Sequence, residues 1–433
     1  MLPQSPSLQS APNLVVADEQ GTLFDVPELA MAGSAGGLLA VPSGEELIAL
    51  PLGSDLFHLP SRRPLGIDRK SGEPVLLEQY GGKTVLGASA VLAPAHTLLL
   101  HPAYQTQPGA PKLPLYAYCA VGWAENGFVV PAVRVDPDVR QDHDRYTAEE
   151  VERCGREMIE RYPHNRLAQH LMHNCLFTYG CPAARNFALG RWEMPLPTAP
   201  GCNSRCLGCI SLQPPDRFPS SQQRIDFVPT VEEIVEIALP HLESAERPVA
   251  SFGQGCEGEP LTNPPLLEKA VQRIREATSQ GTLNLNTNGS RPEAVERLFD
   301  AGLDSIRVSI NSCQLEWYNR YFDPQGYTFE DVIESLHVCR RRGRFASINY
   351  LVFPGISDTY EELEALFRVL ESTRIDMIQW RNLNLDPEEY LRLLEPDPDS
   401  PPFGLKAMMQ RVRERFSKIR FGYFNPCLAD ETR

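Results

Sequence analysis

Residues 282–310 read TLNLNTNGSRPEAVERLFDAGLDSIRVSI. Within this stretch Thr282–Asn288 and Ser305–Ile310 are candidate strands. Between them, apolar residues recur on one face of a helix that ends before Gly302, a residue type common just after helix C-termini. Two strands joined through one helix are expected to run parallel, with a right-handed crossover. This unit sets the fold class of the chain around it.

The same alternation continues on both sides of this unit. Four further candidate strands are Met194–Ala199, Val249–Gly253, Ala346–Phe353 and Ile375–Trp380. Their spacing leaves room for a helix before each next strand, which gives six units. We therefore predict an α/β fold with a partial (β/α)6 TIM-like barrel over residues 194–385. In such folds the chemistry lies on the loops at the C-terminal ends of the strands.

The segments outside the barrel differ from it, and from one another, in the secondary structure that their residue patterns predict. Residues 1–145 are short β segments separated by Gly and Pro, which predicts an N-terminal β-rich domain. Residues 146–193 predict a helical connector, including one helix from Asn165 toward Tyr179. Residues 386–433 form a C-terminal extension that is expected to close the barrel, with a helix over Leu405–Ile419.

Charge and targeting signals narrow the function classes. The chain of 433 residues has a net charge of −15, so nucleic acid and anionic membranes are poor default partners. Met1–Asn13 has no signal-peptide pattern, and no apolar run is long enough to span a membrane. We expect a cytoplasmic protein, in which its 11 cysteines serve metal binding or catalysis rather than disulfides.

The strongest motif is the cysteine loop, residues 201–209, which reads GCNSRCLGC. It places Cys202, Cys206 and Cys209 directly after the first barrel strand, and three thiolates on one tight loop can hold three corners of a [4Fe–4S] cluster. A structural zinc site or a ferredoxin-type carrier needs four ligands, and no Cys or His occurs between Ile210 and Asp226. The spacing favours a cluster in which one iron keeps an open position.

This cysteine spacing on the first βα loop resembles the signature of the radical SAM superfamily. The resemblance implies that S-adenosyl-L-methionine (SAM) chelates the open iron. Reductive cleavage would then give methionine and a 5′-deoxyadenosyl radical, which abstracts hydrogen from a substrate. It also implies a low-potential electron donor of the flavodoxin or ferredoxin type. The substrate is an unknown small molecule, peptide or protein.

The same resemblance implies a SAM site on the later strand ends. Gly258-Glu259-Pro260 is similar to a Gly-Glu-Pro variant of the family motif that receives the methionine ammonium, a role suited to the Glu259 carboxylate. The other implied cofactor contacts are Asn286, Asn288, Ser309, Asn311, Val352 and Arg381.

Further cysteines and histidines give weaker candidates. Cys256 and Cys313 follow the second and fourth strands of the predicted barrel, where each is either a catalytic thiol or a small buried apolar residue. A possible second metal site, weighed against ordinary helix faces, comprises His164, His170, His173, Cys175 and Cys181.

Other functions remain open at this point. The first is a non-catalytic iron–sulfur protein for electron transfer or sensing, and another is a zinc-binding module. Within the enzymes, a radical SAM methyltransferase or an activating enzyme is also compatible. Release of 5′-deoxyadenosine from SAM distinguishes the enzymes from the other two.

Overall fold

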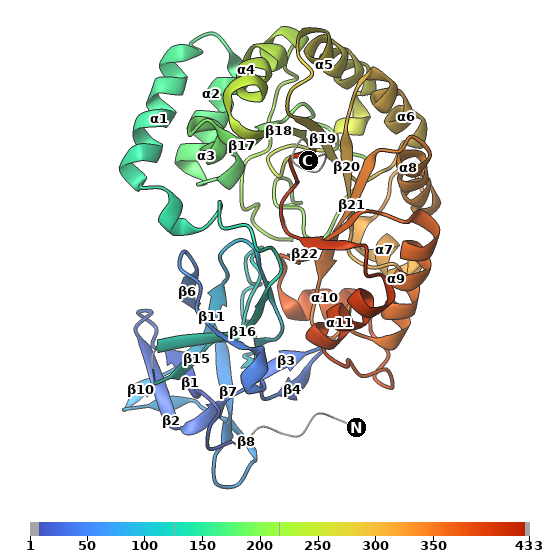
Figure 1. The fold of residues 1–433 in the computed structure, drawn as a ribbon. Coiled ribbons are helices and arrows are strands. Elements are labelled where there is room, and N and C mark those ends of the chain that lie inside the picture. The colour runs from blue at the N-terminus through green and yellow to red at the C-terminus, as the bar shows by residue number, and fades with distance from the viewer. Residues whose placement is uncertain (1–7, 126, 216, 429–433) are drawn as a thin grey trace. The chain divides into compact units, whose positions relative to one another are not determined.

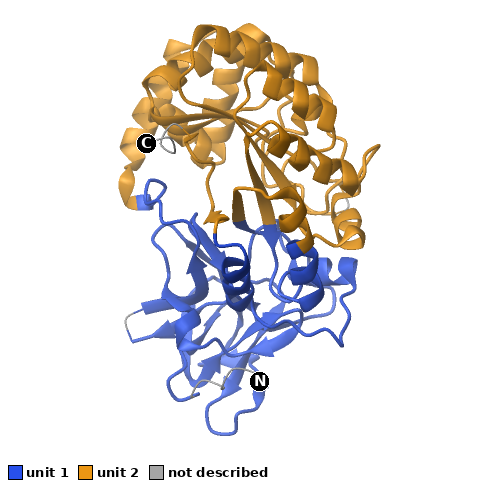
Figure 2. Ribbon diagram, turned by 45° about the vertical axis from the view of Figure 1, so that its right-hand side comes forward, with its two compact units in different colours: residues 1–143, 351–367, 380–417 blue, residues 144–350, 368–379, 418–433 orange. Residues whose placement is uncertain are grey.

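The computed structural model describes residues 8–125, 127–215 and 217–428. The chain divides into two compact units, each assembled from separate segments of sequence (Figure 2). Unit 1 comprises residues 1–143, 351–367 and 380–417, and unit 2 comprises residues 144–350, 368–379 and 418–433. The four consecutive domains expected from the sequence stay a prediction. The two compact units group the segments of the chain in a different way, since each contains stretches that are far apart in sequence.

The first part of unit 1 is a β-rich region, as predicted. Its main sheet has eleven strands among the described residues, with the central order β12-β16-β15-β1-β2-β7-β14 and antiparallel pairing. A three-stranded sheet of β3, β4 and β13 and a two-stranded sheet of β9 and β10 complete the region. The strands of all three sheets are β1 (Asn13–Ala17), β2 (Leu23–Met31), β3 (Gly33–Ala35), β4 (Leu38–Ala40), β5 (Leu47–Ala49), β6 (Asp55–His58), β7 (Arg62–Asp68), β8 (Pro74–Leu76), β9 (Gln79–Tyr80), β10 (Lys83–Thr84), β11 (Leu86–Val91), β12 (His96–Leu98), β13 (His101–Pro102), β14 (Tyr104–Thr106), β15 (Gly122–Ala124) and β16 (Gly127–Arg134). Val15, Ala90, Leu98 and Val130 lie in the core of this region.

Unit 1 also contains two helices from the C-terminal part of the chain. They are α10 (Pro387–Leu394) and α11 (Leu405–Arg415). The buried Arg62 guanidinium lies 3.3 Å from the buried Asp386 carboxylate, which also accepts the Leu113 N–H at 2.8 Å. The helix expected over Leu405–Ile419 corresponds to α11, which begins at Leu405 as expected and ends earlier, at Arg415.

The N-terminal β-rich region is also hydrogen-bonded to the C-terminal end of one barrel strand and to the segment that follows another. Thr97 Oγ1 donates to Trp380 O at 2.8 Å, and the Asn382 side chain joins the backbone of β12 at both His96 O and Leu98 N. Gly36 N donates to Pro354 O at 3.1 Å. These bonds explain why residues 351–367 and 380–417 belong to unit 1.

Most of the predicted barrel lies in unit 2, while its residues 351–367 and 380–385 belong to unit 1. The seven strands of the barrel sheet follow the order β17-β18-β19-β20-β21-β22-β23, and the pairs whose registers are defined run parallel. The strands are β17 (Arg191–Leu196), β18 (Glu246–Phe252), β19 (Thr282–Thr287), β20 (Ser305–Ile310), β21 (Phe345–Val352), β22 (Met377–Asn382) and β23 (Arg420–Gly422). This confirms the α/β class and the partial barrel, while β23 is one strand more than the six expected.

Helices separate successive strands of this sheet and cover its outer side (Figure 1). They are α4 (Val231–Ser244), α5 (Pro264–Ala277), α6 (Pro292–Ala301), α7 (Leu315–Phe322), α8 (Phe329–Arg341) and α9 (Tyr360–Thr373). Thr230 caps α4 with Glu233 in a capping box, as its sequence predicts. Gly302 ends α6 with a φ of 111°, a left-handed conformation that glycine adopts without strain.

The connector before the barrel departs from the single helix expected between Asn165 and Tyr179. It contains α1 (Ala148–Arg161), α2 (Arg166–His170) and α3 (Pro182–Ala188). Between α2 and α3, residues Leu171–Thr178 form a π-helix, η3, with hydrogen bonds between residues five apart. Sequence periodicity does not distinguish such a segment from an α-helix, because both bury one apolar face.

Candidate functional site

The cysteine loop follows β17, at the C-terminal edge of the barrel sheet. Its backbone is fixed by the segment at the end of α7, because Arg205 N donates to Phe322 O at 3.0 Å and Leu207 N to Tyr321 O at 2.9 Å. A turn within the loop bonds Cys209 N to Cys206 O at 3.2 Å. The three predicted cysteine ligands are thus presented from one ordered segment rather than from a free loop.

The thiols of this loop are in an environment that opposes an isolated negative charge. Desolvation raises the pKa of Cys206 well above its ordinary value, and the nearby Cys209 and Cys202 raise it further. Arg224 supplies one compensating contact, since its Nη2 donates to Cys209 Sγ at 3.4 Å. Three thiolates here need additional positive charge, which an iron–sulfur cluster provides. The donor set therefore fits a cluster.

The loop after β18 packs directly on the cysteine loop. Gly258 N donates to Ala199 O at 2.6 Å, and Glu259 N donates to Gly201 O at 2.9 Å. A Cβ atom on Gly258 would lie only 1.9 Å from Gly201 O. The close backbone approach therefore requires glycine at position 258, within the predicted Gly258-Glu259-Pro260 motif.

The Glu259 side chain joins this loop to the end of β19. Its carboxylate accepts hydrogen bonds from Thr287 Oγ1 at 2.5 Å, Asn288 N at 2.7 Å and Leu261 N at 3.0 Å. Burial raises the pKa of Glu259 to about 7. Pro260 follows as the first residue of the short helix Pro260–Thr262. Within the protein, Glu259 positions two neighbouring strand ends, and its contact with the SAM ammonium stays a prediction.

Glu257 joins the segment after β17 to the loop after β18, much as Glu259 joins that loop to the end of β19. This role is not among those predicted from the sequence. One carboxylate oxygen accepts the backbone N–H groups of Thr198 at 2.7 Å and Ala199 at 2.9 Å. The other accepts those of Gly253 at 2.7 Å and Gln254 at 2.8 Å. Burial raises the pKa of Glu257 to about 7. A sequence signal existed, because loop N–H groups in a buried site need acceptors and Glu257 is an acid inside a glycine-rich loop.

Asn288 extends this set of contacts to the cysteine loop. Its Nδ2 donates to Asn203 Oδ1 at 2.8 Å and to Ser204 Oγ at 3.0 Å. Asn203 in turn donates through Nδ2 to Ser290 Oγ at 3.0 Å. The ends of β17, β18 and β19 are therefore held together by buried polar side chains.

The remaining predicted cofactor contacts occupy several environments. Asn286 accepts hydrogen bonds from Asn284 and from Asn425, both at 2.9 Å, in a buried polar network. Ser309 Oγ accepts from Asn349 Nδ2 at 3.1 Å, and Asn311 Nδ2 donates to Trp317 O at 3.2 Å. The structure thus brings Gly258, Glu259 and Asn288 to the cysteine loop, whereas Asn286 lies in a different set of contacts.

Two of the predicted contacts belong to unit 1. Val352 is buried, and its carbonyl accepts the Leu383 N–H at 3.1 Å. Arg381 is half-buried next to Asn382. Their proposed roles toward the adenine and ribose stay predictions.

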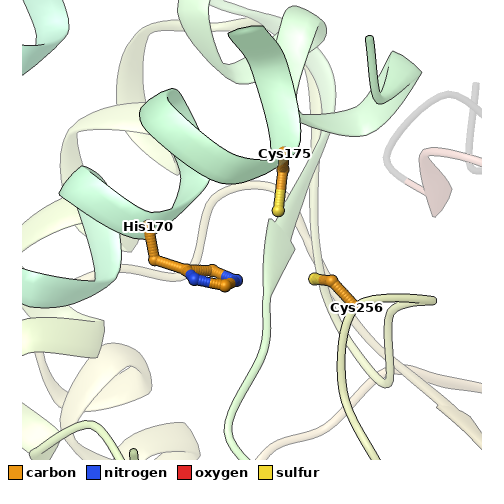
Figure 3. A group of neighbouring side chains, drawn as sticks. All are labelled: His170, Cys175 and Cys256. Atoms are coloured by element: carbon orange, nitrogen blue, oxygen red, sulfur yellow. The ribbon is translucent and has the colours of Figure 1, made fainter. Parts of the chain in front are cut away.

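The two candidate catalytic thiols are both buried. Cys313 follows β20, and its role stays a prediction. Cys256 lies in the loop after β18, one residue before Glu257, and its sulfur points toward His170 and Cys175 of the connector (Figure 3).

A family comparison addresses the barrel and its cysteine loop together. A model of the radical SAM superfamily matches residues 196–370. This region is a radical SAM domain. The match begins at the last residue of β17 and includes the cysteine loop, the Gly258-Glu259-Pro260 segment and the strands β18 to β21. The domain assignment agrees with the resemblance seen in the cysteine spacing.

Individual relatives match this chain over a limited length. The FeMo cofactor biosynthesis protein NifB of Klebsiella pneumoniae is 27% identical over 183 residues, which is 39% of this chain and 38% of NifB. A probable GTP 3′,8-cyclase of Thermococcus kodakarensis is 30% identical over 158 residues, covering 36% of this chain and 46% of that protein. This chain therefore spans less than half the length of either relative.

Solved structures are also similar to parts of this chain. Methylornithine synthase (PylB) covers 63% of this chain and 71% of its own, with a TM-score of 0.38 and 15% identity. The enzyme anSMEcpe with bound AdoMet covers 53% and 63%, with a TM-score of 0.38 and 16% identity. Across residues 8–125, 127–215 and 217–428, no helix has both the length and the apolar character needed to cross a membrane.

Proposed function

We propose that this protein is a radical SAM enzyme whose [4Fe–4S] cluster is held by Cys202, Cys206 and Cys209. When bound, such a cluster supplies one electron to the sulfonium of SAM, which releases methionine and a 5′-deoxyadenosyl radical for hydrogen abstraction from a substrate. The observation that carries the proposal is the direct backbone contact between the cysteine loop and Gly258-Glu259, because cluster and cofactor must be adjacent for this chemistry.

The protein's own residues have defined tasks in this proposal. Glu257 and Glu259 fix the loops after β17, β18 and β19, so that cluster ligands and cofactor contacts are ordered before either cofactor binds. Glu259 also adds negative charge near the site of the SAM ammonium. Arg224 donates to Cys209 Sγ and lowers the cost of its negative charge.

The substrate and the reductant are described only by class. An electron must come from a low-potential donor, for which a flavodoxin or ferredoxin is the natural type. The substrate is a small molecule, a peptide or a protein that offers an abstractable hydrogen atom. We further propose that the protein works in the cytoplasm, where its thiols stay reduced.

The test is SAM cleavage by anaerobically reconstituted protein with dithionite as the reductant. We expect 5′-deoxyadenosine from the unmodified protein and none from Cys206→Ala. The matched control is Cys339→Ala, a buried cysteine of α8 that lies outside the cysteine loop. An intact cluster that binds no SAM and releases no 5′-deoxyadenosine would contradict the proposal and favour electron transfer or sensing.

A further inference from the structure

A second group of soft ligands lies outside the cysteine loop. His170, Cys175 and Cys256 each offer one ligand atom, and these three atoms all lie within 4.8 Å of one another. In Figure 3 the two sulfurs and the imidazole ring point into one common space. From this geometry we propose a mononuclear Cys2His metal site of the zinc class, separate from the cluster at Cys202, Cys206 and Cys209.

The π-helix is the local structure that makes this group possible. His170 and Cys175 are five residues apart, and in an α-helix such residues lie about 140° apart around the axis. In η3 the hydrogen bonds join residues five apart, so that these two positions come to the same face. An α-helical connector would direct the two side chains away from each other.

Cys256 completes the group from a different part of the chain. Its backbone carbonyl accepts the Ile225 N–H at 2.8 Å, which fixes the start of the Cys256-Glu257-Gly258-Glu259 segment. The thiol itself is buried, with an exposed fraction of 4%. A metal bound here would therefore join the connector to the loop that also carries Glu257 and Glu259.

The separation of the ligand atoms favours a single ion. Zinc bonds of about 2.3 Å to sulfur and about 2.1 Å to nitrogen place tetrahedral ligands about 3.5–3.8 Å apart. The three ligand atoms all lie within 4.8 Å of one another, a bound that is compatible with this range. A cubane needs wider spacing, because each thiolate binds a different iron. Cys2His with a fourth position left open is a known zinc ligand set.

The environment of His170 supports metal binding in two ways: its buried Nε2 lacks a hydrogen-bond partner among the described residues, and a cavity connects it to solvent. The same residue lines an open cavity of about 460 Å³, together with His164, His173 and Arg224. An ion can thus enter from solvent through this cavity, and an unpaired buried nitrogen gains a ligand bond when it arrives.

The other members of the group predicted from the sequence have different environments. His173 hydrogen-bonds with Gln169, at 3.1 Å, and Cys181 precedes α3. Neither belongs to the group whose ligand atoms meet. The site therefore takes His170 and Cys175 from the group predicted from the sequence and adds Cys256, for which the sequence predicts only a catalytic thiol or a buried residue.

The experiment uses the full chain with Cys202, Cys206 and Cys209 all changed to Ala, so that the radical SAM cluster cannot bind metal in their place. We expect this variant to bind about one Co²⁺ or Zn²⁺ per chain. The cobalt form should have near-ultraviolet thiolate-to-metal charge-transfer bands. Adding Cys175→Ser or His170→Gln should lower the affinity at least tenfold. Adding Cys339→Ser, a buried cysteine that bonds Arg344 O instead, should leave binding unchanged.

A second measurement covers variants that fail to fold. This measurement uses the triple variant with His170 and Cys175 left intact. Removing bound metal with a chelator should lower its thermal unfolding midpoint, and added zinc should restore that midpoint. Absence of bound metal, charge-transfer bands that survive Cys175→Ser with His170→Gln, or a Cys175–Cys256 disulfide in place of metal would each overturn the proposal. Because this protein cannot form the cluster, the result is independent of whether the intact enzyme cleaves SAM.

Discussion

The Glu257 carboxylate accepts the Thr198 backbone N–H at 2.7 Å and thereby ties the end of the first barrel strand to the loop that follows the second. Four backbone donors and the Thr198 hydroxyl surround this one buried side chain. Water is a poor replacement for an acceptor that satisfies so many donors, because the Glu257 side chain is itself buried.

We predict that Glu257→Gln lowers the free energy of unfolding by about 2–4 kcal/mol, because the amide group of Gln presents donors to backbone N–H groups. Chemical denaturation of the cluster-free protein measures this. Glu268→Gln is the control, since it removes only the exposed ion pair with Arg297 and should cost less than about 1 kcal/mol. Equal effects of the two changes would contradict the assigned role of Glu257.

Gly258→Ala should prevent correct assembly of the site. The added Cβ would meet Gly201 O at 1.9 Å, so the loop must move away from the cysteine loop. We expect less than a tenth of the normal iron content after reconstitution. Gly201→Ala is a matched control from the other side of the contact, because its Cβ would meet only Thr262 Oγ1, at 3.9 Å. Normal cluster loading in Gly258→Ala would show that the contact is dispensable.

The buried pair Arg62–Asp386 should be important for the stability of unit 1. Asp386→Ala leaves the Arg62 guanidinium buried without its counter-charge and removes the acceptor of Leu113 N–H. The expected loss is about 3–5 kcal/mol, the usual cost of breaking a buried pair from one side. Thermal unfolding of Asp386→Ala beside Asp397→Ala, an exposed change, tests this. Similar midpoints would refute it.

His241 should give the protein a defined sensitivity to acid. Its Nε2 bonds to Trp192 O at 2.6 Å, and burial lowers its pKa from 6.5 to about 4. The unfolded chain therefore binds a proton between pH 6.5 and 4 that the folded chain excludes, so this contribution to stability is complete above pH 6.5 and is lost as the pH falls toward 4. The expected loss between pH 7 and pH 5 is about 2 kcal/mol.

The comparison for this effect is His241→Gln, which keeps a donor for Trp192 O but does not titrate. Urea unfolding at a series of pH values should give a flatter profile for the variant by that amount. His101, whose pKa burial also lowers to about 4, remains in both proteins and contributes equally to each. Parallel profiles would show that His241 does not carry the effect.

The regular part of the fold was predictable because its signals are local. Ser305–Ile310 has the bounds expected for it, and the helices between strands follow from apolar periodicity and caps such as Thr230 and Gly302. The strand β23 was not predicted, because its three residues, Arg420 to Gly422, have neither an apolar run nor an alternating pattern. The π-helix was also missed, since burial of one face does not reveal how tightly a helix is wound.

The site was predictable where residue type and spacing carry the chemistry, as in Cys202, Cys206 and Cys209. It was not predictable where long-range contacts decide. Glu257 and Glu259 look equivalent in sequence, yet they join different pairs of strands. Asn286 and Asn288 are also similar neighbours, but Asn286 bonds to Asn425, a residue 139 positions away. Such pairings depend on how the sheet curves, which no short segment encodes.

The bonds from Thr97 to Trp380 and from Asn382 to the backbone of β12 have a consequence for dissecting this protein. A fragment starting at the connector would lack the hydrogen-bond partners of Trp380 and Asn382 and the ion-pair partner of Asp386. These groups, which contact protein in the full chain, would then be exposed to solvent. The N-terminal β-rich region thus contributes to the structure of the last part of the barrel, and its removal should destabilise that part.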